Sequence, residues 1–102
     1  MEYIQVFTAF EKKKDAEKIV GILLEKRLAA CVQMVPVESV YRWKGRVERA
    51  KEVVCVIKTR KSLYGKIERE IMANHPYEVP EIISVPVHRG SKGYLGWIGK
   101  ET

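Results

Sequence analysis

The eight residues from His75 to Ile82 hold most of the side chains in this chain that could do chemistry. Their sequence, HPYEVPEI, places an imidazole, a phenol and two carboxylates between and beside two prolines. Each proline fixes its own φ and biases the residue before it toward an extended backbone. We interpret the segment as a stiff connector between a helix and a strand, which would hold its side chains in fixed relation.

His75 is the first candidate for metal binding, because an imidazole binds transition metals and Glu78 or Glu81 can add an oxygen ligand. A strong site needs three or four ligands in a set geometry, and this spacing matches no known cage. The alternative is that His75 is a hydrogen-bonded structural residue. Spacing alone leaves both interpretations open.

Two other chemistries find less support. Cys31 and Cys55 would need a base to act as nucleophiles, and both lie in apolar strand-like segments where thiols are unreactive. No glycine-rich phosphate loop is present, and we expect no enzyme activity. Tyr41 and Trp43 could stack bases, but residues 52–58 have no aromatic side chain. We expect no nucleic-acid binding, and an aromatic hairpin tip that packs against a partner.

Composition sets broad limits. The net charge is +6, from 19 Lys and Arg against 13 Asp and Glu. The basic residues are scattered, which favours a heavily charged surface over a nucleic-acid stripe. No apolar run approaches the ~20 residues of a membrane helix, and the N-terminus lacks the features of a signal peptide. We expect a cytoplasmic protein with no membrane partner.

Hydrophobic periodicity predicts a mixed α and β order. Lys44-Gly45 makes a turn, and a strand and then a helix follow it. Thr59 or Ser62 would cap that helix. The predicted elements are a strand at 3–10, a helix from Asp15 to about Ala29, a strand at 30–43, a strand at 53–57, a helix ended by Pro76, a strand at 82–87 and a short helix from Ser91. Prolines at 36 and 86 predict edge strands or irregular ends.

This order is βαββαβ plus a C-terminal helix, which predicts an α+β, ferredoxin-like fold. Both long helices would cover one face of a four-stranded antiparallel sheet. Residues 53–57 are apolar at every position, as in a strand buried on both faces. We therefore expect another copy of the chain to cover the open face, with the hairpin from Cys31 to Ile57 reaching toward it.

The hairpin turn also predicts where the two cysteines lie. If Lys44-Gly45 is a two-residue turn, Cys55 faces Met34 and Cys31 faces Lys58. The offset of three residues corresponds to about 10 Å along a strand, beyond the ~4.4–6.8 Å that separates the Cα atoms of a disulfide. We expect two buried free thiols, unless a bulge near Pro36 changes the register.

Five stretches of the chain then suggest a family. They are RLAAC at 27–31, YRWKG at 41–45, Glu52 with IKT at 57–59, HPYEVPEI at 75–82, and YLxW at 94–97. Together and in this order they resemble the CutA family of divalent-cation tolerance proteins, over nearly the whole chain. The resemblance implies a single CutA-like domain over residues 1–102. It also implies a cytoplasmic homotrimer of PII-like architecture, a link to tolerance of copper and other divalent metals, and no well-established catalytic activity.

The resemblance implies two kinds of site. The first is a weak site for Cu²⁺ or another divalent cation at His75 and Glu81. Copper-binding members resemble this chain with a cysteine where Phe7 stands and a histidine where Asn74 stands. The second is a PII-like cleft between subunits that binds a small molecule or an anion; its candidate residues are Tyr41, Glu52, Lys58 and Tyr77.

Overall fold

A computed structural model describes all residues from Met1 to Thr102 and confirms the ferredoxin-like fold. The elements are β1 (Tyr3–Phe10), α1 (Lys13–Glu25), β2 (Cys31–Trp43), β3 (Arg46–Arg60), a 3₁₀ turn η1 (Lys61–Leu63), α2 (Tyr64–Asn74), β4 (Ile83–Pro86) and α3 (Lys92–Glu101). The strands form one antiparallel sheet in the order β2-β3-β1-β4. Both proline-containing strands, β2 and β4, are edge strands, as predicted.

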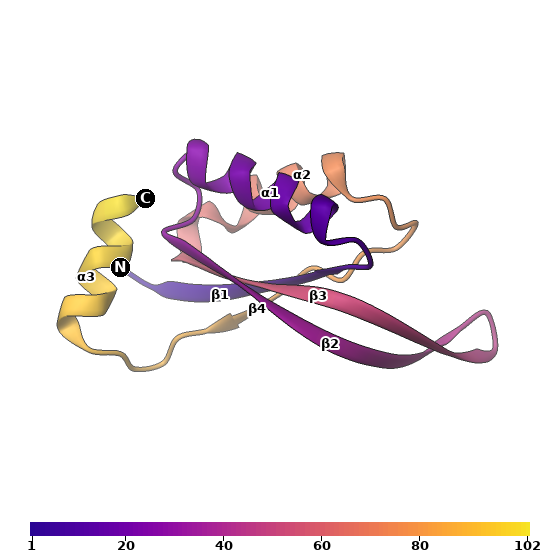
Figure 1. The fold of residues 1–102 in the computed structure, drawn as a ribbon. Helices are drawn as coiled ribbons and strands as arrows, with labels where there is room; N and C mark the ends of the chain where they lie inside the picture. The colour runs from indigo at the N-terminus through magenta and orange to yellow at the C-terminus, as the bar shows by residue number, and fades with distance from the viewer.

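The helices α1 and α2 lie side by side on one face of the sheet (Figure 1). Alternate residues of β1 point toward them, and Val6, Thr8 and Phe10 are fully buried there. The helices contribute a stripe of buried apolar side chains at helical spacing: Ala16, Ile19, Leu23, Ile67 and Ile71. This face supplies the hydrophobic core of the chain, because apolar burial is the main favourable term in folding.

Helix α1 ends earlier than predicted, at Glu25 rather than near Ala29. Arg27 takes a left-handed backbone conformation, with φ of 56°. The N–H of Leu28 donates to the carbonyl oxygen of Leu23 at 2.8 Å, and that of Arg27 donates to Leu24 at 3.1 Å. These two bonds form a Schellman motif, with arginine at the position that glycine usually takes. Because apolar residues continue through this turn, the sequence pattern did not show where the helix ends.

The predicted cap of α2 is wrong. Neither Thr59 nor Ser62 caps the helix, which is preceded by the 3₁₀ turn η1 and has no side-chain cap. Thr59 instead donates its hydroxyl to the carbonyl oxygen of Leu28 at 2.6 Å, in a fully buried position. The hydroxyl thus ties β3 to the turn after α1, which no local pattern indicated.

The hairpin between β2 and β3 has the predicted register. Lys44 and Gly45 both have positive φ, 51° and 79°, as a two-residue type I′ turn requires. Cys55 pairs with Met34 and Cys31 pairs with Lys58, with no bulge at Pro36. Because β1 ends opposite Val53, residues 37–52 extend beyond the sheet as a two-stranded ribbon, here called the arm (Figure 1).

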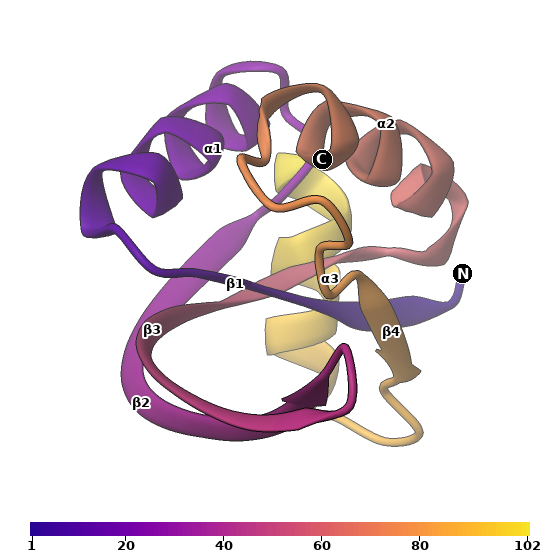
Figure 2. The same cartoon turned by 90° about the vertical axis from the view of Figure 1, so that its right-hand side faces the viewer.

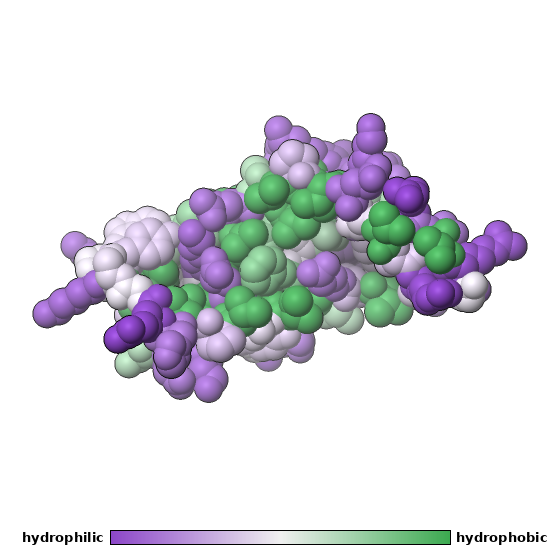
Figure 3. All heavy atoms as spheres, turned by 90° about the horizontal axis from the view of Figure 1, so that it is seen from below, coloured by the Kyte–Doolittle hydropathy of each residue, from purple (hydrophilic) through white to green (hydrophobic).

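The face of the sheet opposite the helices, here called the open face, is largely apolar. Directly paired residues share a face in an antiparallel sheet. The pairings place one set of apolar side chains on the open face: Phe7, Val35, Val54, Val56, Ile83 and Val85. Of these, Ile83 is 53% exposed and Val35 is 43% exposed. Figure 3 shows hydrophobic side chains gathered across the middle of this side of the molecule.

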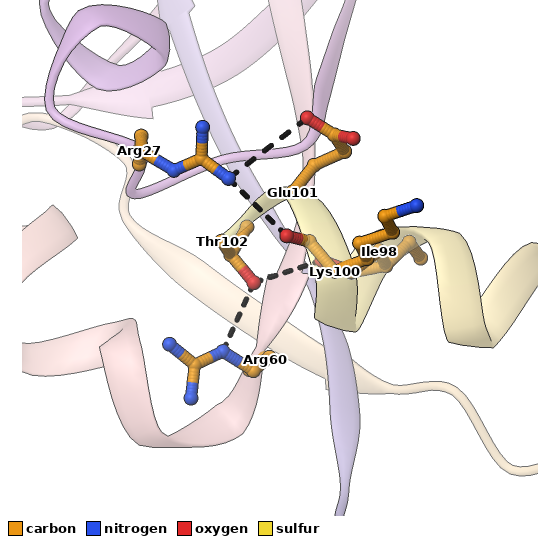
Figure 4. A network of polar contacts seen from close by, with 6 residues as sticks. All are labelled: Arg27, Arg60, Ile98, Lys100, Glu101 and Thr102. Atoms are coloured by element: carbon orange, nitrogen blue, oxygen red, sulfur yellow. Dashed lines mark hydrogen bonds and ion pairs between the residues drawn. The ribbon is translucent and has the colours of Figure 1, made fainter.

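The C-terminal helix α3 packs at the end of the sheet where β1 begins and β3 ends (Figures 1 and 2). Arg27 donates to the carbonyl oxygen of Lys100 at 3.2 Å, and Arg60 donates to the hydroxyl of Thr102 at 2.9 Å (Figure 4). Both guanidinium groups therefore lie at the C-terminal end of α3, where the helix dipole favours positive charge. No helix of the chain has the length and apolar content needed to cross a membrane.

Candidate functional site

His75 is the first residue after α2 and is held on three sides. Its Nε2 lies 2.8 Å from the carbonyl oxygen of Ala9, and its Nδ1 accepts a hydrogen bond of 3.2 Å from the backbone N–H of Tyr77. The ring stacks on Phe10, with centroids 4.1 Å apart and planes 12° apart. Since Nδ1 accepts, Nε2 carries the proton and donates to Ala9. His75 thus anchors the start of the connector to the end of β1.

These contacts leave no free nitrogen on the imidazole for a metal. Burial lowers the pKa of His75 below its usual value, and the bond to Ala9 and the charges of Asp15 and Glu52 oppose this only in part. No group of three or more His, Cys, Asp or Glu side chains is arranged to hold a metal ion. The residues present therefore do not fit a resident metal at His75 in this conformation.

Tyr77 reaches from the connector to the arm. Its hydroxyl donates to a carboxylate oxygen of Glu52 at 2.7 Å, and its ring lies 4.6 Å from the ring of His75. Burial, the bond to Glu52 and the nearby negative charge of Glu52 raise the pKa of Tyr77. The phenol therefore stays protonated and keeps donating at neutral pH. Tyr77 therefore lies beside His75 and points toward Glu52.

A pocket of about 360 Å³ lies between the connector and the arm. Its walls come from the end of β1, from the arm and from the connector: Ala9, Glu11, Ser39, Tyr41, Trp43, Glu52, Tyr77, Glu78, Val79 and Glu81. Four of the six predicted site residues therefore meet here, namely Tyr41, Glu52, Tyr77 and Glu81. They come from three separate stretches of sequence.

The other two predicted residues lie outside the pocket. His75 is not among the lining residues, although its ring contacts Tyr77. Lys58 lies near the opposite end of the sheet, where its ammonium group is 5.4 Å from the ring centroid of Tyr94 on α3. The fold therefore does not bring Lys58 together with Tyr41 and Glu52 within one chain.

The pocket is acidic. Four glutamates line it and no lysine, arginine or histidine does. The ion pairs of the chain involve other carboxylates, on Glu2, Glu17, Glu38, Glu70 and Glu101. The lining glutamates thus keep an uncompensated negative charge in a chain whose net charge is +6. Such a cavity attracts cations and repels anions.

Sequence reasoning missed Glu11 and Ser39 as pocket residues. Glu11 reads as part of the charged stretch before a helix, and only the return of the connector past the end of β1 places it in the pocket. Ser39 had a detectable signal, because residues 39, 41 and 43 alternate along β2 and so share a face. Two of those three residues are aromatic, and their shared face lines the pocket.

The chain is similar to proteins of known family over nearly its whole length. The family described as CutA1 divalent ion tolerance protein matches residues 4–101. The divalent-cation tolerance protein CutA of Thermus thermophilus is 38% identical over 103 residues, covering 100% of this chain and 99% of that protein. The chloroplastic protein CutA 1 of Oryza sativa is 39% identical over 97% of this chain.

The solved structure of CutA1 from Oryza sativa superimposes with a TM-score of 0.95 at 38% identity, covering 100% of this chain and 94% of that one. The chain spans about half the length of the plant and mammalian relatives, 54–56%. The likeness therefore covers this one domain and not the rest of those longer proteins.

Proposed function

Because the chain belongs to the CutA1 divalent ion tolerance family, we propose that it acts in tolerance of copper and other divalent metal ions as a homotrimer. The names of the family and of its Thermus thermophilus member describe ion tolerance and not an enzymatic reaction. We propose the same for this chain, acting in the cytoplasm as a binding or regulatory protein.

The apolar open face is the observation that carries the proposed assembly. Phe7, Val54 and Val56 lie in the centre of that face, and Ile83 and Val85 extend it onto the edge strand. Contiguous exposed apolar patches on this scale mark interaction sites. No other part of the chain covers them, so we infer that copies of the chain cover each other. The number three comes from the resemblance to the CutA family.

The arm supports the same proposal. A two-stranded ribbon alone is at best marginally stable in water, yet the arm carries exposed apolar residues at Val40 and Val47. A partner subunit packed against these side chains would stabilise the ribbon and remove them from water.

Light scattering tests the assembly. We expect a particle with three times the 11.8 kDa mass of one chain at micromolar concentration. A stable monomer would overturn the proposed homotrimer and the role given to the open face. A dimer would agree with an open face covered by another copy and would contradict the number of three copies.

Complementation tests the cellular role. The chain would be expressed in a host that lacks its own CutA protein, and growth would be followed at rising CuCl₂ and ZnCl₂. We expect growth at metal concentrations that stop the host carrying an empty vector. Equal sensitivity in both strains, with the protein present by immunoblot, would contradict a role in tolerance.

Direct metal binding by His75 and Glu81 stays a prediction, and the geometry favours only weak binding. A metal at His75 would have to replace the bond to Ala9 or the bond from Tyr77. Calorimetry with CuCl₂ on the wild-type protein and on His75→Ala measures this binding. Equal heats in the two proteins would exclude His75 as the ligand.

A second candidate function is that of a ligand-binding regulatory module. The pocket favours it, because Tyr41, Glu52 and Tyr77, which the resemblance to the CutA family suggested for a PII-like cleft, line one cavity. A volume of about 360 Å³ lies at the small end of the range for small-molecule sites, ~300–1,000 Å³. We propose that the pocket binds a small ligand.

A further inference from the structure

The walls of the pocket indicate what class of ligand it takes. Three of them are aromatic side chains, Tyr41, Trp43 and Tyr77, and the remaining polar lining is dominated by carboxylates. We propose that this pocket binds a small organic cation, a primary alkylammonium or a guanidinium group. The inference rests on the ligand-binding role proposed above and adds the chemical class of the ligand.

The aromatic walls suit a cation because the face of a tyrosine or tryptophan ring carries negative electrostatic potential. The ring of Trp43 already has the ammonium group of Lys44 5.6 Å from its centroid, so a cationic ligand would face the rings of Tyr41 and Tyr77. Aromatic walls also suit the alkyl part of such a ligand, which loses contact with water on binding. A bare inorganic ion gains nothing from that second interaction.

The carboxylates supply charge but not a metal cage. Glu11, Glu52, Glu78 and Glu81 surround the cavity without ion-pair partners, yet no three acidic, histidine or cysteine side chains converge to hold a metal. Dispersed negative charge around an aromatic cavity matches a large, weakly hydrated cation better than a small divalent ion, which needs close oxygen ligands.

An anionic ligand fits this cavity poorly. Lys58, the predicted cationic contact, lies against Tyr94 at the other end of the sheet, and no basic residue lines the cavity. The carboxylate of Glu52 is held in place by the hydroxyl of Tyr77 at 2.7 Å. A fixed carboxylate beside aromatic rings is ordered before the ligand arrives, which reduces the entropic cost of binding.

Titration followed by NMR tests the ligand class on the whole chain. The probes are n-butylammonium chloride, the neutral n-butanol, the anionic sodium butyrate, and MgCl₂. The readout is the indole N–H signal of Trp43, with the indole of Trp97 on α3 as the reference outside the pocket. We expect saturable shifts of Trp43 with n-butylammonium alone, and an unchanged Trp97.

Two variants with matched controls locate the binding. Glu52→Gln keeps an acceptor for Tyr77 but removes the charge, and Glu68→Gln does the same to the carboxylate that accepts from Tyr64 at 2.8 Å on α2. Tyr41→Ala removes one aromatic wall, and Tyr94→Ala removes a tyrosine of similar exposure outside the pocket. We expect Glu52→Gln to weaken n-butylammonium binding at least about fivefold and Tyr41→Ala about threefold. The two control variants should bind as the wild type does.

Three outcomes would overturn the proposed ligand class. If butyrate shifts the indole signal of Trp43, the ligand-binding role stands and the proposed cationic class of ligand is wrong. Equal shifts with MgCl₂, in competition with n-butylammonium, would show nonspecific attraction of cations. No shift with any probe would overturn both the ligand class and the ligand-binding role. The homotrimer is judged separately, by light scattering on the same samples.

Discussion

Ile57 and Val56 are neighbours in β3, yet they point to opposite faces of the sheet. Ile57 lies against the helices and is fully buried, whereas Val56 lies on the open face and stays partly exposed. Residues 53–57 are apolar on both sides of the sheet, so the two faces of this segment differ in what covers them. We infer that the helix-covered face stabilises the single chain and that the open face stabilises the assembly.

Alanine substitutions at these two neighbours measure that difference most directly. Ile57→Ala would remove a fully buried side chain and leave a cavity, and we expect the free energy of unfolding to fall by about 2–4 kcal/mol. Val56→Ala should cost less than about 1 kcal/mol when the protein is dilute enough to be monomeric. Urea denaturation followed by circular dichroism measures both. Equal losses at low concentration would show that the two faces do not differ in this way.

A charge on the open face should act on assembly. In Val56→Lys, an ammonium group would be buried without a partner whenever a second copy covers the face, which is strongly unfavourable. We expect light scattering to report monomers with an unchanged circular dichroism spectrum. Tyr94→Lys, an exposed position on α3, serves as the control. An oligomer of unchanged mass in Val56→Lys would mean that the interface lies elsewhere.

His75 belongs to the helix-covered side, because its ring stacks on Phe10. Its pKa is lower in the folded chain than its usual value of about 6.5. Below that pH the unfolded chain binds more protons than the folded chain, so the free energy of unfolding should fall as the pH falls from about 7 to 5. This part of the loss should disappear in His75→Ala and persist in His88→Ala, which changes an exposed residue. An unaltered pH dependence in His75→Ala would rule out His75 as its source.

His75→Ala should also lower stability at pH 7.5, by about 1–3 kcal/mol, because the carbonyl oxygen of Ala9 loses its side-chain donor and Phe10 loses its stacking partner. The mass of the oligomer should not change. Denaturation and light scattering on the same sample separate the two effects. Dissociation of the oligomer without loss of stability would place His75 at an interface instead.

The reactivity of the two thiols compares the two faces of the sheet with the smallest change to the protein. Cys55 is buried under the helices, and burial raises its pKa to about 11. It should react with a thiol reagent only as fast as the chain unfolds. Cys31 pairs with Lys58 on the open face and is partly exposed, so it should react in dissociated chains and be protected in the assembly. Labelling Cys31→Ser and Cys55→Ser separately assigns the two rates.

Local sequence patterns were sufficient for the element order and for the hairpin register. The alternation of β1 and the apolar stripes of α1 and α2 specify which side of each element is buried. The turn at Lys44-Gly45 fixes every pair from Trp43–Arg46 to Cys31–Lys58, because side chains repeat every two residues and a single slip would move them to the other face. The family resemblance, which relied on motifs spread along the chain, also held.

Contacts between distant segments decided the details that local patterns missed. The turn after α1, in which Arg27 takes a left-handed conformation, goes with a hydrogen bond from Arg27 to Lys100, 73 residues away. Thr59 bonds to Leu28 instead of capping α2.

The candidate site shows the same division. The sequence by itself identified the connector, its stiffness and the chemistry of its side chains. Only the tertiary structure decided that both ring nitrogens of His75 form hydrogen bonds with the backbone. It also decided that Lys58 lies away from the pocket and that Glu11 and Ser39 line it. The physical reason is that proline and helix preferences act over a few residues, whereas hydrogen-bond partners and the charge of a cavity depend on which distant segments meet in space.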